Sequence, residues 1–149
     1  MITSSKQKGN ITELECITYF SKLGYNVSIP FGENCRYDFI LDVNNILVKI
    51  QCKTCRISKD KSVLFFSCES NRNNGSNNRR IKYSCEDVDY FATFYNNVCY
   101  LVPSNECFTY KQLRLFPTKN MQKKGVNLAE KYVADIQINL LLKHNRLCT

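Results

Sequence analysis

The fold is decided by one stretch, Arg36-Tyr-Asp38-Phe-Ile-Leu-Asp-Val-Asn44-Asn45-Ile-Leu-Val-Lys-Ile-Gln51-Cys-Lys53. Two strand-like runs flank Asn44-Asn45, a pair that tolerates the positive φ angles of a tight hairpin turn. Successive side chains of a strand point to opposite faces. One face of the predicted hairpin is apolar and consists of Tyr37, Phe39, Leu41, Val43, Ile46, Val48, Ile50 and Cys52. The other face is mostly polar and carries Arg36, Asp38, Asp42, Lys49, Gln51 and Lys53, with Ile40 and Leu47 among them.

A turn centred on residues 44 and 45 sets Asp38 opposite Gln51 and Arg36 opposite Lys53. Opposed Cβ atoms in an antiparallel pair are about 4.5–5.5 Å apart. A carboxylate, an amide oxygen and an ammonium therefore converge on one patch, which suits metal-assisted hydrolysis with oxygen ligands for a hard divalent cation. The alternative interpretation is an ordinary solvated hairpin face.

Further short motifs occur in order along roughly the first 103 residues. They are Lys8-Gly9-x-x-x-Glu13, Gly24-Tyr25-x-Val27, Pro30-Phe31-Gly32, Arg36-Tyr37-Asp38, Ile50-Gln51-x-Lys53-Thr54 and Val88-Asp89-Tyr90-Phe91-Ala92. Together they resemble the core of the PD-(D/E)XK nuclease superfamily. More narrowly, the sequence resembles its group I intron-associated homing endonucleases, in which Gln replaces the usual acid. Tyr37 stands where the superfamily has proline.

The resemblance implies roles for the residues of the patch. Asp38 would bind a metal ion, with the Gln51 side chain and the Cys52 backbone carbonyl as further ligands. Glu13 would bind it through water or complete a second site. Lys53 would position the attacking water and stabilise charge on the phosphate. An all-oxygen ligand set suits Mg²⁺, with Mn²⁺ able to substitute, better than zinc.

Glu13 has two possible roles. A helix is predicted to follow the polar residues 1–10 and to end near Leu23, before Gly24. Helical spacing sets Glu13 on the inward stripe of Ile17 and Phe20, and Glu15 on the outward face. Glu13 could form a capping box with Asn10. With the family resemblance, we favour a carboxylate directed at the hairpin.

Composition limits the class of protein. The chain has 149 residues, a net charge of 21 − 13 = +8 and no long apolar run. We expect a single domain, no membrane span, no signal peptide and a polyanionic partner. Nine cysteines without a secretion signal favour free thiols and an intracellular, reducing compartment, either cytoplasm or nucleus. Cys52-x-x-Cys55 has no second pair at zinc-ribbon spacing, so we interpret both as ordinary thiols.

The remaining chain completes a predicted α/β fold. Expected elements are strands at 25–29 and 62–68, the latter as part of a meander, a short helix at 83–88 and a second hairpin at 90–102. A strand or short helix at 108–115, a helical segment at 128–134 and a strand or helix at 136–142 follow. This order matches a restriction-endonuclease-like αβββαβ core with a mixed, largely antiparallel sheet. The core would span about 5–103, and a C-terminal extension about 104–149.

Two basic segments are candidates for DNA contact. Residues 69–80 are predicted to form a loop that could clamp phosphates. The segment at 118–127 could contact base edges. Each segment could also be a solvated loop. The candidate DNA-binding residues are Arg72, Arg79, Arg80, Lys119, Asn120, Gln122, Lys123 and Lys124.

The sequence thus predicts a Mg²⁺-dependent DNA endonuclease that cuts double-stranded DNA, of the homing type, acting as a homodimer or homotetramer. Two alternatives remain open. One is a Holliday-junction resolvase or repair nuclease of the same superfamily, and the other is a DNA-binding module whose catalytic site has decayed.

Overall fold

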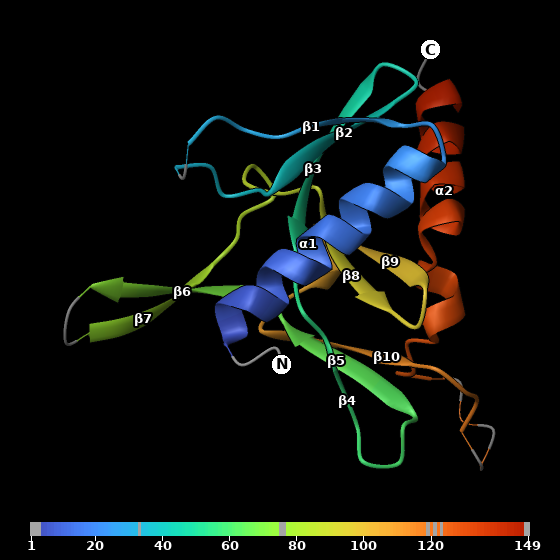
Figure 1. Cartoon of the computed structure of the whole chain (residues 1–149). Coiled ribbons are helices and arrows are strands. Elements are labelled where there is room, and N and C mark those ends of the chain that lie inside the picture. Colours follow the sequence, from blue (N-terminus) through green and yellow to red (C-terminus); the bar gives the residue numbers. More distant parts are fainter. Residues whose placement is uncertain are drawn as a thin grey trace.

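The computed structural model describes residues 4–32, 34–74, 77–118, 120, 122 and 124–147. Within these residues, a central sheet of five strands is accompanied by two α-helices, α1 (Ser5–Lys22) and α2 (Ala134–Leu147) (Figure 1). The strands of this sheet are β1 (Asn26–Ser28), β2 (Phe39–Val43), β3 (Ile46–Cys52), β8 (Tyr90–Tyr95) and β9 (Val98–Pro103).

The central sheet has the order β1-β2-β3-β8-β9, and only its β3–β8 pair is parallel. The predicted fold class, α/β with a mixed, largely antiparallel central sheet, is therefore confirmed. Both predicted hairpins are present, and positive φ angles at Asn44 (54°), Asn45 (68°), Asn96 (50°) and Asn97 (63°) form their turns.

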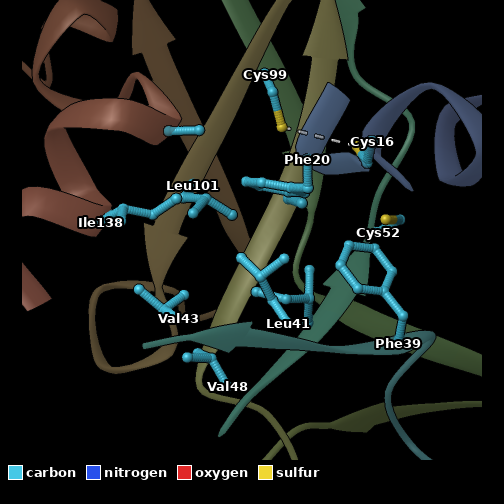
Figure 2. Packing of buried hydrophobic residues seen from close by; sticks show 13 residues of the cluster. Cys16, Phe20, Phe39, Leu41, Val43, Val48, Cys52, Cys99, Leu101 and Ile138 are labelled. Carbon is cyan, nitrogen blue, oxygen red and sulfur yellow. Dashed lines mark hydrogen bonds between the residues drawn. The ribbon is translucent and has the colours of Figure 1, made fainter. Parts of the chain in front are cut away.

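The apolar face of the β2–β3 hairpin forms the main core. Both helices cover this face, because α1 and α2 contribute to the same buried cluster (Figure 2). The cluster consists of Cys16, Phe20, Phe39, Leu41, Val43, Val48, Ile50, Cys52, Ala92, Cys99, Leu101, Ala134 and Ile138. The predicted alternation is confirmed, since every second residue of β2 is buried.

A second, three-stranded sheet packs on the other face of β8 and β9. It contains β4 (Arg56–Ile57), β5 (Val63–Ser67) and β10 (Tyr110–Arg114), in the order β10-β5-β4. We expected the strand at 62–68 to continue a meander of the central sheet. The strand is present as β5, but its place in the central sheet was predicted wrongly. Leu64 and Phe66 on β5 pack against Phe91 and Val102 instead, so the chain buries two faces of the central sheet rather than extending it.

Residues 69–80 were predicted as a loop, but 69–74 and 77–80 lie in a two-stranded ribbon of β6 (Glu69–Asn74) and β7 (Asn77–Lys82). The ribbon extends from the molecule at the left of Figure 1. Its strands are held by backbone pairing, from Glu69–Lys82 to Asn74–Asn77. Since the strands are almost entirely polar, the apolar alternation by which strands are recognised in a sequence is missing here.

Helix α1 begins earlier than predicted. Ser4 is its N-cap, and it forms a capping box with Gln7. Asn10 lies inside the helix, so the capping-box interpretation of Glu13 is wrong. The helix buries Thr12, Cys16 and Phe20, whereas Leu14 is 62% exposed.

The short helix predicted at 83–88 is replaced by a turn. Asp87 accepts a hydrogen bond from Ser84 N (2.8 Å), and Asp87 N donates to Ser84 Oγ (3.2 Å). These side chains satisfy the backbone locally, as Ser and Asp often do in turns. Asp89 has a structural role, because its Oδ2 accepts from Lys49 N (2.7 Å) at the start of the β3–β8 pairing.

The C-terminal part contains two 3₁₀ helices, η1 (Ser104–Glu106) and η2 (Ala129–Tyr132), besides β10 and α2. The segment at 108–115 is thus a strand, and that at 136–142 lies in α2. The eight cysteines in the described residues are free thiols. No helix within the described ranges is both long and apolar enough to cross a membrane.

Candidate active site

The candidate site lies where the β2–β3 ladder ends. The last paired residues are Phe39 and Ile50, and Asp38 N donates to Ile50 O (2.8 Å). The Asp38 carboxylate then takes over as acceptor. Its Oδ2 accepts from Cys52 N (2.6 Å) and from Gln51 Nε2 (2.7 Å). The predicted meeting of Asp38 and Gln51 across the hairpin is therefore present.

Two oxygens converge on the Gln51 amide. Besides its bond to Asp38 Oδ2, Gln51 Nε2 donates to Cys52 O at 3.3 Å. A half-turn of the terminal amide would exchange its NH₂ group for Oε1. Three oxygens would then face one another, an arrangement that a cation between them would stabilise. The residues present therefore fit a hard divalent metal ion, and Asp38, Gln51 and the Cys52 carbonyl would hold it.

Glu13 approaches this end of the hairpin from α1. The helix is anchored there, since the Thr12 and Thr54 hydroxyl oxygens lie 3.0 Å apart. Burial, and then the nearby Asp38 charge, raise the pKa of Glu13 above its ordinary value. Burial also raises the pKa of Asp38, although Cys52 N–H and Gln51 oppose the shift. Glu13 and Asp38 are therefore neighbouring, partly desolvated carboxyl groups, and a cation bound between them would stabilise both as anions.

Lys53 directly follows Cys52, the last residue of β3. Its Nζ donates to Glu69 O (2.9 Å) and to the Tyr83 hydroxyl (3.2 Å), and lies 4.7 Å from the centre of the Tyr83 ring. Burial is the main cause that lowers the pKa of Lys53, while the Asp38 charge opposes the shift. Tyr83 was not predicted as a site residue, and no motif in the sequence marks it.

Carboxylate, histidine and cysteine side chains alone make no metal site in the described part of the chain, where no group of three is arranged to hold an ion. The candidate site therefore depends on amide and backbone oxygens, as the Gln-x-Lys pattern suggested. Cys52 is buried under the hairpin, and Cys55 Sγ donates to Phe94 O (3.6 Å).

The candidate DNA-binding residues occupy two separate places. Arg79 and Arg80 are exposed on β7 of the ribbon. Arg72 pairs in register with Arg79, and its side chain lies outside the described part. The segment after β10 lies away from the ribbon, at the lower right of Figure 1.

In that segment Asn120, Gln122 and Lys124 are exposed, while Lys119 and Lys123 lie outside the described residues. Gln122 N donates to Asn120 Oδ1 (3.3 Å), and Gln122 Nε2 donates to Lys124 O (3.2 Å). The two amide side chains thus stabilise the local turn, and contact with a base would compete with these bonds.

The sequence profile of the PD-(D/E)XK endonuclease family matches residues 3–135 of the chain. The chain belongs to this family. It is therefore a nuclease, and PD-(D/E)XK nucleases generally use divalent metal ions. A search of curated proteins found no match. Among solved structures, the chain is similar to the bacterial homing endonuclease I-Ssp6803I, with 24% identity and a TM-score of 0.75. The match covers 96% of this chain and 97% of the other, and at this identity it supports the fold.

The two glutamates of α1 provide a matched test of the site. The pKa of Glu13 is raised above 4.5, so the folded protein holds this proton more tightly than the unfolded chain. Ionised Glu13 therefore lowers the stability of the metal-free protein as the pH rises from about 4.5 through the raised pKa. We expect Glu13→Gln to keep or raise the metal-free melting temperature at pH 7, since no cap is lost.

Added Mg²⁺ should raise the melting temperature less in Glu13→Gln than in the Glu15→Gln control, because Glu15 is exposed on the outer side of α1. Differential scanning fluorimetry across pH and Mg²⁺ concentration measures both effects. Equal Mg²⁺ responses in the two variants would remove Glu13 from the site.

Proposed function

We propose that this nuclease is a divalent-metal-dependent DNA endonuclease that makes site-specific double-strand cuts of the homing type. The observation that carries the proposal is the convergence of Asp38 Oδ2 and Cys52 O on the Gln51 amide, with Lys53 directly after β3. The similarity to a homing endonuclease over nearly the whole of both chains supports the homing type. Mg²⁺ is the proposed ion, and Mn²⁺ should substitute for it.

When bound, the metal ion would activate water and neutralise charge on the scissile phosphate. Asp38 would hold the ion through its carboxylate, Gln51 through Oε1 and Cys52 through its carbonyl. Glu13 would contact it through water or complete a second site. Because Gln51 is neutral where most of the superfamily has an acid, the ion should be held less tightly than by three carboxylates.

Lys53 would contribute the positive charge that the reaction needs. An ammonium has three N–H donors. Among the described residues, Glu69 O and the Tyr83 hydroxyl accept two of them. The third would orient the attacking water or bind a phosphate oxygen as negative charge develops. Burial strengthens this interaction, since less water screens it.

Binding of DNA would depend on the basic ribbon and on the net charge of +8. Arg72, Arg79 and Arg80 are proposed to contact phosphates from the ribbon. Lys119, Asn120, Gln122, Lys123 and Lys124 are proposed to contact DNA from the C-terminal extension, residues 104–149 of the single domain. Because one such chain reads few bases and cuts one strand at a time, we propose a homodimer or homotetramer as the active form.

Substitutions at the end of the β2–β3 hairpin test the catalytic assignment. We expect Asp38→Asn and Lys53→Ala each to reduce cleavage by about 10²-fold or more, because each removes charge that acts on the reacting phosphate. Lys49→Ala is the matched control, since Lys49 lies on β3, which leads into Lys53, and its Nζ donates to Glu86 O (2.7 Å) instead. Plasmid libraries incubated with Mg²⁺, with and without EDTA, measure cleavage, and sequencing of the ends gives the target.

Wild-type rates in Asp38→Asn or Lys53→Ala would contradict the site. Preferential cleavage of four-way junctions over linear duplex would assign a resolvase instead. If the protein binds duplex DNA but shows no cleavage that depends on a divalent ion, it is a DNA-binding module whose catalytic site has decayed.

The ribbon is tested through the salt dependence of DNA binding. We expect Arg79→Ala/Arg80→Ala to weaken binding to all sequences, and to reduce the slope of log K against log salt concentration by about 0.9 for each lost phosphate contact. A control with the same loss of charge is Lys22→Ala/Lys131→Ala, which removes exposed lysines on α1 and η2. Fluorescence anisotropy across salt concentrations measures both slopes. If the two double variants have the same slope as the wild type, the arginines do not contact phosphates.

A further inference from the structure

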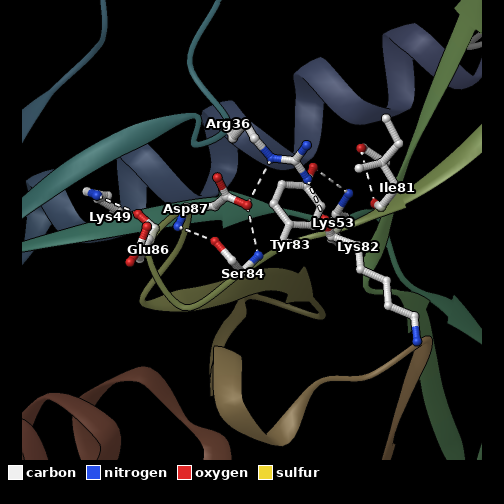
Figure 3. A network of polar contacts seen from close by, with 10 residues as sticks. Arg36, Lys49, Lys53, Ile81, Lys82, Tyr83, Ser84, Glu86 and Asp87 are labelled. Carbon is white, nitrogen blue, oxygen red and sulfur yellow. Dashed lines mark hydrogen bonds and ion pairs between the residues drawn. The ribbon is translucent and has the colours of Figure 1, made fainter.

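The base of the ribbon is attached to the catalytic hairpin by two cations. Glu69 and Lys82 form the first pair of the ribbon. Glu69 O accepts from Lys53 Nζ at 2.9 Å. Lys82 O accepts from an Arg36 terminal nitrogen at 2.8 Å (Figure 3). Arg36 lies just before Asp38 and β2, and Lys53 lies just after Gln51 and the end of β3, so both belong to the open end of the hairpin. Both strands of the ribbon therefore depend on side chains from the candidate active site.

Tyr83 joins these two cations. The Arg36 Cζ lies 4.5 Å and the Lys53 Nζ 4.7 Å from the centre of its ring, and its hydroxyl accepts from Lys53. Both cations are thus attracted to one aromatic ring. The ring itself is fixed by an edge-to-face contact with Phe91, whose centroid is 5.3 Å away and which is buried in the second core.

Asp87 compensates the gathered positive charge. Its Oδ2 lies 3.1 Å from Arg36 Nε and accepts from Ser84 N at 2.8 Å (Figure 3). The turn after Tyr83 therefore fixes the guanidinium, and the guanidinium holds the end of β7. Arg36 uses Nε for the ion pair with Asp87 and a terminal nitrogen for the hydrogen bond to Lys82 O, so its planar guanidinium spans both partners.

We propose that Tyr83 and Arg36 are positioning residues that couple the seating of the β6–β7 ribbon on DNA to the placement of the Lys53 ammonium. This inference rests on the proposed function. A lysine side chain is long and flexible, so its ammonium stays in one place only where acceptors fix it. One acceptor of Lys53 is the ribbon itself, through Glu69 O, and the other is Tyr83.

The coupling has a consequence for specificity. A ribbon that is correctly seated on its target keeps Glu69 O beside the site, and Lys53 is held toward the metal ligands. A ribbon bound out of place moves Glu69 O, so Lys53 loses an acceptor while the protein stays bound. Cleavage would then discriminate between sequences more strongly than binding does, because an error in seating lowers the rate as well as the affinity.

Tyr83→Phe tests the positioning role, because it keeps the ring and removes the hydroxyl, which is one of the two acceptors of Lys53 among the described residues. We expect the single-turnover cleavage rate at saturating DNA and Mg²⁺ to fall by about tenfold or more, as for loss of a hydrogen bond to a charged group. DNA affinity, measured with Ca²⁺ in place of Mg²⁺, should stay as in the wild type. Tyr25→Phe is the matched control, since Tyr25 packs on Phe20 away from the site.

A double-mutant cycle tests the coupling to the ribbon. At saturating DNA, Arg79→Ala/Arg80→Ala should reduce the cleavage rate of the wild type, because the ribbon is then seated poorly. The same pair should reduce the rate less in the Tyr83→Phe background, where the link to Lys53 is already weakened. Circular dichroism and melting temperatures establish that each variant is folded.

The outcomes separate this proposal from the proposed function. If the wild type and Tyr83→Phe cleave DNA at the same rate, the positioning role is overturned and the endonuclease assignment stays intact. If Tyr83→Phe and Arg79→Ala/Arg80→Ala reduce the cleavage rate independently, so that their effects are additive in free energy, the coupling is overturned. A wild type that shows no cleavage dependent on a divalent ion overturns both.

Discussion

The register of the β2–β3 hairpin is the constraint on which the site depends. Asn44 and Asn45 both adopt positive φ, and the turn they form pairs Phe39 with Ile50. One step further, the Asp38 carboxylate meets the Gln51 amide and Cys52 N. A slip by one residue would turn every side chain of one strand to the other face. It would bury Asp38 or Gln51 and expose half of the core, so the same apolar packing that stabilises the fold also selects the ligand geometry.

The part of the site that lies on this hairpin could be predicted from the sequence. Strand alternation and the Asn-Asn turn are local signals, and together they specify which residues oppose each other. The inward position of Glu13 also followed from helical spacing, although the true cap is Ser4 rather than Asn10. The cap was missed because its partner Gln7 lies in a polar segment without apolar periodicity.

The rest of the site could not be predicted, because it depends on contacts between distant segments. Tyr83 reaches Lys53 only after the chain has passed through the second sheet and the ribbon. The ribbon itself lacks an apolar face, so its strands looked like a loop. Its ladder is held by backbone bonds, which are independent of side-chain type. The turn at Ser84 and Asp87 replaced a predicted helix for a similar reason, since side chains that bond their own backbone can outcompete helix formation.

The proposed function requires that Asp38, the Gln51 amide oxygen and the Cys52 carbonyl hold a divalent ion. The most direct measurement is anomalous diffraction from crystals of the protein grown or soaked with Mn²⁺. We expect a strong peak about 2.0–2.3 Å from Asp38 Oδ2 and the Cys52 carbonyl oxygen, with the Gln51 amide turned so that Oε1 faces the ion. A Mn²⁺ peak elsewhere on the chain, with Gln51 Nε2 still donating to Asp38, would contradict it.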